Sequence, residues 1–325
     1  DHRREARTDR SCCVSFQRMV GAGIVGWLAW RLLGSEPRPA FAPHQVHPWP
    51  LPGRSVFVDG TELFVRRLNE GGGRPIVLIH GWGDHTAIVW QCVAPALGAT
   101  RDVIMVDQRN HGRSSRRRGR YEIEDVADDT AAVIRQLGFR SVDIVGYSMG
   151  GMVAQALAWR HPALVDTLVL GATTAGAVPR WRQALSVGVL VAGRALDRVS
   201  RVELSVARYW YLIRRGVVGR EHAQWLWDEQ MARDPELYWQ AGFAAVRFDS
   251  RSYVGRITAP TLVIIPTSDQ LVAPRQQRDL FTRLRGAALV ELVGARHEAP
   301  LTHAAEIARA IESFTGERRH DTRAS

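Results

Sequence analysis

The chain has 325 residues, of which 46% are hydrophobic and 23% are charged, as expected for a globular protein with one large α/β domain or a domain that carries an insertion. All 43 basic residues are arginine, which excludes Schiff-base catalysis by lysine and a P-loop. The formal net charge is +10, but the arginines form no stripe with interleaved aromatic residues, so we expect no nucleic-acid partner. The three cysteines have no metal-ligand spacing, and we expect neither a metal nor another cofactor.

The first 53 residues differ from the rest of the chain. Residues 19–33, MVGAGIVGWLAWRLL, are apolar apart from Arg31 and follow several arginines. The run is shorter than the roughly 20 residues of a spanning helix, although Arg31 can extend it by snorkelling. It fits a membrane anchor, a signal peptide cleaved after Ala40-Phe41-Ala42, or an amphipathic helix packed on the body. We favour the anchor, which predicts a membrane-associated rather than a cytoplasmic protein; the proline-rich residues 35–53 predict a linker.

Short apolar runs alternate with helical stretches after this linker. Residues 54–68 form two β-type runs around Asp59-Gly60, which predicts a hairpin. Residues 121–138 have helical periodicity and end at a glycine. Such alternation predicts βαβ units and a mainly parallel sheet. The other expected strands span 75–80, 102–107, 141–146, 165–171, 261–266 and 287–293, and the other expected helices lie near 274–285 and 302–314.

Residues 172–256 interrupt the alternation. They contain no clear strand and have the pattern of several helices rich in Trp and Arg. Because the strand–helix pattern resumes afterwards, we predict an inserted helical cap rather than a separate tandem domain. The expected organisation is therefore an N-terminal segment at 1–53, a first core part at 54–171, the cap at 172–256 and a second core part at 257–325.

The pentapeptide Gly146-Tyr147-Ser148-Met149-Gly150 fits G-x-S-x-G between a predicted strand and a predicted helix, the context of a nucleophile elbow. A turn this tight strains the serine backbone and leaves no room for side chains two residues away, which accounts for Gly146 and Gly150. The amide of Met149, at the helix N-terminus, is expected to face a developing oxyanion. The alternative is an incidental serine in a glycine-rich turn.

Two further residues complete a candidate catalytic triad in the chain order Ser, Asp, His. Asp269 follows the predicted strand 261–266, and His297 follows the predicted strand 287–293. We expect His297 Nε2 to accept the proton of Ser148 while Asp269 holds the Nδ1–H group.

Other titratable residues fit these roles less well. His303 and Asp279 lie inside predicted helices, and His161 ends one, directly before a proline. The segment GATTAG at 171–176 holds no acid, so the alternative position for the triad carboxylate is empty.

The loop after residues 75–80 is expected to supply the second oxyanion donor. It consists of His80-Gly81-Trp82-Gly83-Asp84, and its position assigns this role to the amide of Trp82. Gly81 and Gly83 let the backbone approach the substrate. We expect His80 to have a structural role, binding the loop.

The segments HGWGD, DQRNHGRS, GYSMGG, SDQLVAP and GARHEAP resemble those of the α/β-hydrolase superfamily, and the likeness covers roughly residues 54–315. The resemblance implies a mostly parallel eight-stranded sheet flanked by helices, with the cap inserted. HGWG and RNHG are most similar to small bacterial serine carboxylesterases. The serine excludes the aspartate-nucleophile members of the superfamily, the haloalkane dehalogenases and epoxide hydrolases.

Three residues near these motifs need separate interpretation. Many relatives have glycine where Asn110 stands. His111 is expected to have a structural role in its loop, or else to line the entrance. Glu298, directly after His297, either perturbs the pKa of that histidine or faces solvent.

The cap is rich in aromatic residues, including Trp181, Trp210, Trp225, Trp227 and Trp239. A cap over the nucleophile forms part of the pocket wall, so an apolar cap favours an apolar acyl or alcohol group. We therefore expect hydrolysis of a carboxylic ester of a small apolar substrate through an acyl-enzyme. The same triad serves carbon–carbon bond hydrolases, perhydrolases or haloperoxidase-like enzymes and lactonases, and a low-turnover receptor on this fold is the alternative outside enzymes.

Overall fold

The computed structural model describes residue 41 and residues 44–46, 51–83, 85–176, 180–199 and 202–321. Residues 42–325 form one compact unit, which holds all the strands and helices named below. The apolar segment 19–33, predicted to be a membrane anchor, lies outside the described residues. Among the helices that are described, none is both long enough and apolar enough to cross a membrane.

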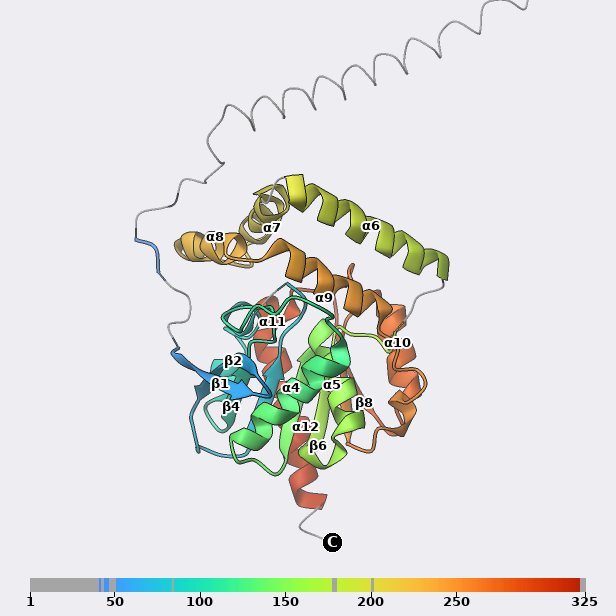
Figure 1. Ribbon diagram of the computed structural model, residues 1–325. Coiled ribbons are helices and arrows are strands. Elements are labelled where there is room, and N and C mark those ends of the chain that lie inside the picture. Colours follow the sequence, from blue (N-terminus) through green and yellow to red (C-terminus); the bar gives the residue numbers. More distant parts are fainter. Residues whose placement is uncertain are drawn as a thin grey trace, which may run out of the picture. The chain divides into compact units, whose positions relative to one another are not determined.

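An eight-stranded sheet lies at the centre of this unit, with the strand order β1-β2-β4-β3-β5-β6-β7-β8 (Figure 1). Strands β1 (Gly53–Val58) and β2 (Thr61–Leu68) pair antiparallel, and β2 pairs antiparallel with β4. Their hairpin turn holds Asp59 and Gly60 at φ 46° and 74°, the left-handed conformation that tight hairpins require. The remaining pairs are parallel and join β3 (Pro75–Ile79), β4 (Asp102–Val106), β5 (Val142–Tyr147), β6 (Val165–Gly171), β7 (Thr261–Pro266) and β8 (Ala288–Leu292). The predicted hairpin and mainly parallel sheet are confirmed.

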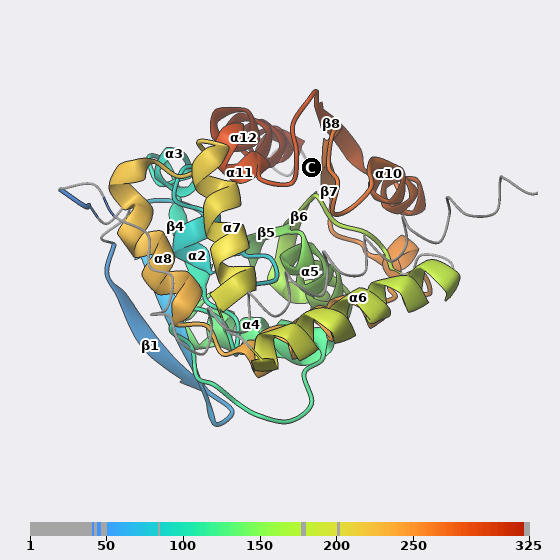
Figure 2. The same ribbon diagram turned by 90° about the horizontal axis from the view of Figure 1, so that it is seen from above.

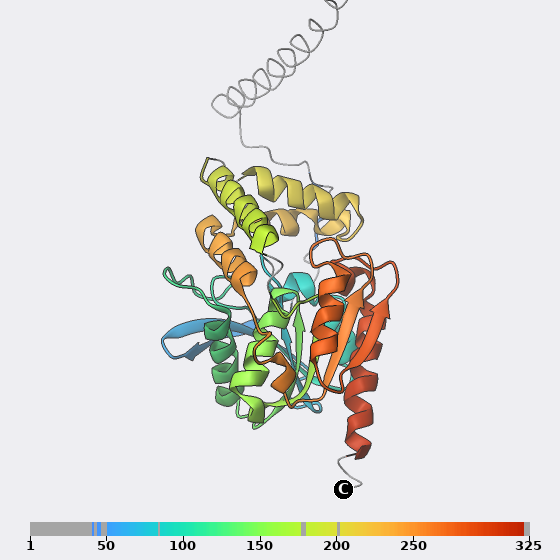
Figure 3. The ribbon, with the colours of Figure 1, turned by 90° about the vertical axis from the view of Figure 1, so that its right-hand side faces the viewer.

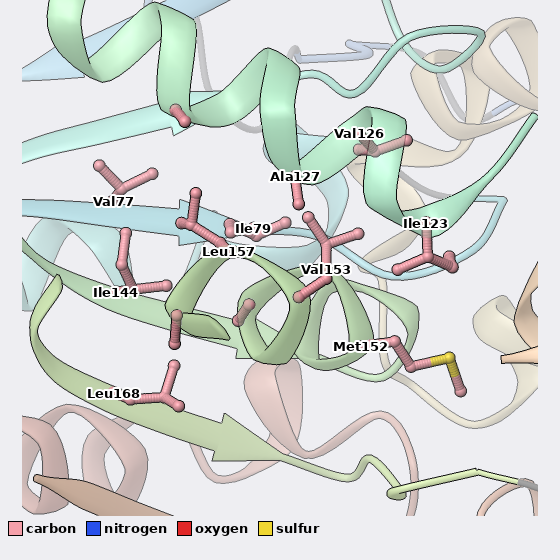
Figure 4. Packing of buried hydrophobic residues seen from close by; sticks show 14 of the residues in the cluster. Val77, Ile79, Ile123, Val126, Ala127, Ile144, Met152, Val153, Leu157 and Leu168 are labelled. Atoms are coloured by element: carbon pink, nitrogen blue, oxygen red, sulfur yellow. The ribbon is translucent and has the colours of Figure 1, made fainter. Parts of the chain in front are cut away.

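Helices cover both faces of the sheet. Helices α4 (Ile123–Gln136) and α5 (Met149–Arg160) lie on one face, and α3 (Ala94–Leu97) and α12 (Ala304–Asp321) lie on the other (Figure 3). Alternate strand residues therefore face two separate apolar clusters. In the first cluster, Val153 and Leu157 of α5 pack on side chains of three strands (Figure 4), namely Val77, Ile79, Ile144 and Leu168. Burial on both faces explains why the inner strands are continuously apolar in sequence.

The remaining core helices agree with the sequence pattern where they are long. Helix α10 (Pro274–Arg283) occupies the predicted position, whereas α12 continues to Asp321, beyond the predicted end near residue 314. Three short helices were not predicted, because a single turn carries no measurable periodicity. They are α2 (Thr86–Val89), α3 and α11 (Ala299–Thr302).

The chain between β6 and β7 forms helices above the carboxyl edge of the sheet (Figures 1 and 2). They are α6 (Arg180–Val199), α7 (Val202–Arg214), the short 3-10 helix η2 (Arg220–His222), α8 (Ala223–Met231) and α9 (Pro235–Arg247). The chain leaves the core and returns to it at one place, because Gly176 forms a bridge with Asp249 and Ser250 N–H donates to Ala175 O at 2.7 Å. This part of the chain is thus an insertion within one compact unit, as its position in the sequence suggested.

Candidate active site

Ser148 lies at a sharp turn between β5 and α5. Its backbone has φ 57° and ψ −123°, a conformation that costs a non-glycine residue of order 1–3 kcal/mol and points to function. The flanking glycines are required by space, because a Cβ on Gly146 would overlap the carbonyl oxygen of Gly150, and one on Gly150 would overlap that of Ile79. A Cβ on Gly151 would lie 2.6 Å from Thr173, in the loop after β6. The strand–turn–helix context expected for a nucleophile elbow is therefore present.

The structure brings Ser148, His297 and Asp269 together from three loops at the carboxyl edge of the sheet. Ser148 Oγ lies 3.0 Å from His297 Nε2, and His297 Nδ1 lies 2.9 Å from Asp269 Oδ2. Asp269 follows β7 and His297 follows β8, as expected. The tautomer that fits carries its proton on Nδ1, which donates to Asp269, and leaves Nε2 free to accept from Ser148.

The carboxylate of Asp269 is fixed by donors from its own loop and from α10. Its side chain is fully buried. Oδ1 accepts from the amides of Leu271 and Val272 at 2.8 and 3.1 Å, and Oδ2 accepts from Gln277 Nε2 at 3.0 Å. Gln277 was not singled out in the sequence, since nothing in the pattern of α10 marks it. These bonds hold Oδ2 in place beside His297 Nδ1.

The other residues considered as the acid or base of the triad have partners elsewhere. Asp279 forms an exposed ion pair with Arg283 at 2.8 Å on α10, and His161 lies 2.7 Å from Asp128. His303 Nδ1 contacts Thr302 Oγ1 at 2.9 Å at the end of α11. These contacts leave His297 and Asp269 as the pair that reaches Ser148.

Two backbone amides beside Ser148 are available for an oxyanion. Met149 is the first residue of α5, where amides have no partner within the helix. The loop after β3 runs next to Ser148, since a Cβ on Gly81 would lie only 3.1 Å from Ser148 Cβ. In the described part of the chain, neither the Met149 nor the Trp82 amide is engaged in a hydrogen bond. The geometry is compatible with the two donors that were predicted.

His80 is fully buried beneath this loop. Its Nε2 accepts the amide of Gln108 at 3.0 Å, so Nδ1 carries the proton and donates to Gly81 O at 2.8 Å. Both nitrogens are thus occupied in holding two loops together, which agrees with the structural role expected for His80.

His111 and Asn110 are also structural. His111 is buried, and burial lowers the pKa of its imidazole to about 3, so it is neutral at physiological pH. It does not line the cavity described below, so the entrance role considered for it is not supported. Asn110 has φ 67°, the left-handed region where glycine or asparagine is favoured, and Oδ1 accepts from Arg117 N at 2.7 Å.

Glu298 is mostly shielded from solvent and contacts the cap. Its side chain is only 10% exposed and lies 3.4 Å from Tyr211 Oη and from Arg215 Nη2, both in or just after α7. The expectation that it either perturbs His297 or faces solvent is thus incomplete, because sequence spacing gave no sign that the cap approaches this loop.

A cavity of about 1010 Å³ opens above Ser148 between the core and the cap helices. Its wall is predominantly aliphatic and aromatic, with a smaller number of polar residues. The apolar lining includes Ile88, Val89, Met152, Leu190, Leu212, Val246 and Phe248. The polar lining includes Arg208, Gln270, Gln276, Arg296 and Glu298.

Comparison with known proteins agrees with this arrangement. Residues 74–190 match the alpha/beta hydrolase fold family. The pimeloyl-[acyl-carrier protein] methyl ester esterase of Neisseria meningitidis is 32% identical over 262 residues, which span 77% of this chain and 81% of that esterase. A poly(3-hydroxyalkanoate) depolymerase of Ectopseudomonas oleovorans is 29% identical over 75% of this chain and 85% of its own. The crystal structure of the enol-lactonase from Burkholderia xenovorans is similar with a TM-score of 0.69 at 28% identity, covering 81% of this chain and 100% of the lactonase.

Proposed function

Since this chain belongs to the alpha/beta hydrolase family and is an enzyme that acts on esters, we propose that it cleaves a carboxylic ester of an apolar substrate through an acyl-enzyme on Ser148. One observation carries the proposal. Ser148 sits in a strained turn at a helix N-terminus with its Oγ 3.0 Å from His297 Nε2. A structural serine needs neither the strain nor the imidazole.

In the acylation step, Ser148 Oγ attacks the ester carbonyl carbon while its proton passes to His297 Nε2. The carbonyl oxygen becomes an oxyanion, which accepts hydrogen bonds from the amides of Trp82 and Met149. The carbon–oxygen bond to the alcohol then breaks, and the imidazolium gives its proton to the departing alkoxide. Asp269 stabilises the imidazolium and stays ionised.

In the deacylation step, water attacks the acyl-enzyme as His297 Nε2 takes its proton. The bond from the acyl carbon to Ser148 Oγ breaks, and the serine recovers its proton from His297. The balance is one ester and one water converted to one carboxylic acid and one alcohol. No cofactor is required.

The cavity supports an aliphatic substrate of some length. Its volume of about 1010 Å³ is at the upper end of ordinary ligand pockets, well above the space that an acetyl group needs. Its apolar wall favours a hydrocarbon chain over a polyol or a peptide. The two curated relatives named above act, by their names, on a pimeloyl-[acyl-carrier protein] methyl ester and on a poly(3-hydroxyalkanoate). We therefore propose a linear aliphatic acyl group.

A lactone is the second candidate substrate, because the enol-lactonase of Burkholderia xenovorans shares the fold at 28% identity. A lactone is an internal ester, so the same steps open its ring. The shape of the cavity, rather than the triad, determines whether a linear ester or a lactone is the substrate.

Hydrolysis of p-nitrophenyl esters of graded acyl length, from acetyl to decanoyl, tests both the activity and the chain preference. We expect kcat/KM to rise with chain length to an optimum beyond acetyl. The Ser148→Ala variant should have no burst of p-nitrophenol and should not be labelled by a fluorophosphonate, as measured by intact mass. Absence of hydrolysis for all esters, with aliphatic lactones opened instead, would favour the second candidate, whereas inactivity toward both classes would contradict the proposal.

A further inference from the structure

The outward side of cap helix α6 is apolar in its described part between residues 188 and 196. Its exposed residues between 188 and 196 are Gly188, Val189, Val191, Ala192, Ala195 and Leu196, with Val189 63% and Val191 54% exposed. At 100° per residue they share one side of the helix. Arg194, the one ionisable residue of this stretch, pairs with Glu236, and Asp197, directly after the stretch, is buried and accepts from Trp239 Nε1 at 2.6 Å.

Helix α7, the next cap helix, also exposes residues, of a different type. Trp210 and Tyr211 are 41% and 46% exposed, and Arg214 and Arg215 follow them with exposed guanidinium groups. The guanidinium of Arg214 lies 5.4 Å from the centre of the Trp210 ring. Figure 2, which looks down on the cap, shows α6 and α7 in front of the core. We call the exposed residues of α6 at 188–196 and of α7 at 210–215 the cap face.

Helix α10, which also faces solvent, has a different surface. Its exposed residues are Arg275, Arg278, Asp279, Thr282 and Arg283. In contrast to the polar surface of α10, the aliphatic side chains of α6 form an apolar patch in water. Such patches mark sites of interaction with a protein or a membrane.

We propose that the cap face binds the surface of a membrane that contains anionic lipids. Aliphatic side chains suit the acyl boundary, the indole of Trp210 suits the interface, and the guanidinium of Arg214 suits anionic headgroups. The formal net charge of +10 adds long-range attraction to such a surface. An acidic protein partner would be matched by charged side chains along α6, and its exposed side has none between residues 188 and 196.

Two further observations agree with this orientation. Tyr211 and Leu271, which is 77% exposed, both line the cavity above Ser148, so the cavity reaches the surface beside the cap face. An apolar substrate then has a path from the lipid to the nucleophile.

The second observation concerns the segment before β1. Val46 N–H donates to Glu221 O at 2.8 Å, and the carbonyl oxygen of Val46 lies 2.8 Å from His222 Nδ1. Val46, in the linker, is therefore attached to the cap at η2.

Co-sedimentation of residues 42–325, a compact unit of their own that lacks the predicted anchor, with vesicles tests the proposal. We expect binding to vesicles of phosphatidylcholine mixed with phosphatidylglycerol, and weaker, less salt-sensitive binding to pure phosphatidylcholine.

The triple variant Val189→Gln, Val191→Gln, Leu196→Gln should have a partition coefficient between water and vesicles that is lower by about tenfold or more, because three aliphatic side chains lose their contact with lipid. The matched control is Phe57→Gln with Leu289→Gln, two exposed apolar side chains outside the cap, which should bind as the parent does. Unchanged hydrolysis of a short soluble ester shows that both variants are folded.

A polarity-sensitive fluorophore reports on the cap face itself. In the full chain with its three cysteines replaced by serine, a label on Ala192→Cys should shift to the blue when anionic vesicles are added. A label on Gln136→Cys, an exposed position at the far end of α4, should not shift. If the protein sediments with vesicles while the Ala192 label does not respond, another segment binds the membrane and the proposal is wrong. A label that is already blue-shifted without vesicles, or that responds only to an acidic carrier protein, would also overturn it.

Discussion

The indole Nε1 of Trp82 donates a 2.7 Å hydrogen bond to the carbonyl oxygen of Tyr238, which joins the loop after β3 to cap helix α9. The two rings are stacked with centres 4.5 Å apart. Next to them, Arg208 Nη1 of α7 donates to Gly83 O at 2.9 Å. The loop proposed to bind the oxyanion is thus held on both sides of Trp82 by the cap, so the packing of the cap determines where the Trp82 amide lies.

Substitution Gly242→Ala should disturb this arrangement. The added Cβ would lie 2.6 Å from Trp82 Cζ2, so the indole must shift, and we expect the Trp82 amide to shift with it. We expect kcat for an ester substrate to fall by about tenfold or more, since loss of one oxyanion donor costs ~10²–10³-fold. KM should change much less, because the oxyanion exists only in the transition state. Steady-state kinetics measure both.

The control for this variant is Gly188→Ala on α6, where a Cβ would meet no atom within 4 Å. It adds the same methyl group to a cap helix and should leave kcat unchanged. Equal kinetics for the two variants would mean that the position of Trp82 is not set by α9.

The contacts between the Trp82 loop and the cap could not be predicted from the sequence. The positions of Ser148, Asp269 and His297, which the structure brings together, were predictable because a local motif and the strand order specify them. The partners of the Trp82 side chain were not, because they belong to a helix more than a hundred residues away whose packing leaves no local pattern. The contact of Glu298 with Tyr211 was missed for the same reason. Among the elements, the strands were found because buried strands are continuously apolar, whereas single-turn helices such as α2 were not.

Substitution Asp269→Asn tests the assignment of the triad acid. The side chains are nearly isosteric, so the fold should be retained, but the amide favours the wrong imidazole tautomer. We expect kcat to fall by roughly 10⁴-fold with little change in KM. Asp279→Asn on α10 serves as the comparison, because that carboxylate forms only an exposed ion pair with Arg283. Should Asp279→Asn be the inactive variant, the assignment of Asp269 would have to be abandoned.

Removal of residues 1–41 tests the predicted anchor at 19–33. Residues 42–325 form a compact unit of their own, so the shortened protein should fold and hydrolyse a soluble ester at the parental rate. If the segment is an anchor, the full chain should be found in the membrane fraction and require detergent, and the shortened chain should be extracted by salt. Identical fractionation of the two proteins would favour a packed helix instead.

Acid should destabilise the protein through His111. Burial lowers the pKa of this imidazole to about 3 in the folded state, and in the unfolded chain the pKa returns to about 6.5. Between these values the unfolded state binds a proton that the folded state does not, so the free energy of unfolding falls as the pH falls through this window. The contribution of one such group to the free energy of unfolding reaches up to ~1.4 kcal/mol per pH unit.

The free energy of unfolding, measured with denaturant from pH 7 to pH 4, should therefore depend less steeply on pH for His111→Gln than for the parent. His303→Gln, between α11 and α12, should retain the parental slope. A His111→Gln slope equal to that of the parent would show that acid acts on other groups, of which buried Asp107 is the first to examine, because its ion pair with Arg66 at 3.2 Å is lost when it is protonated.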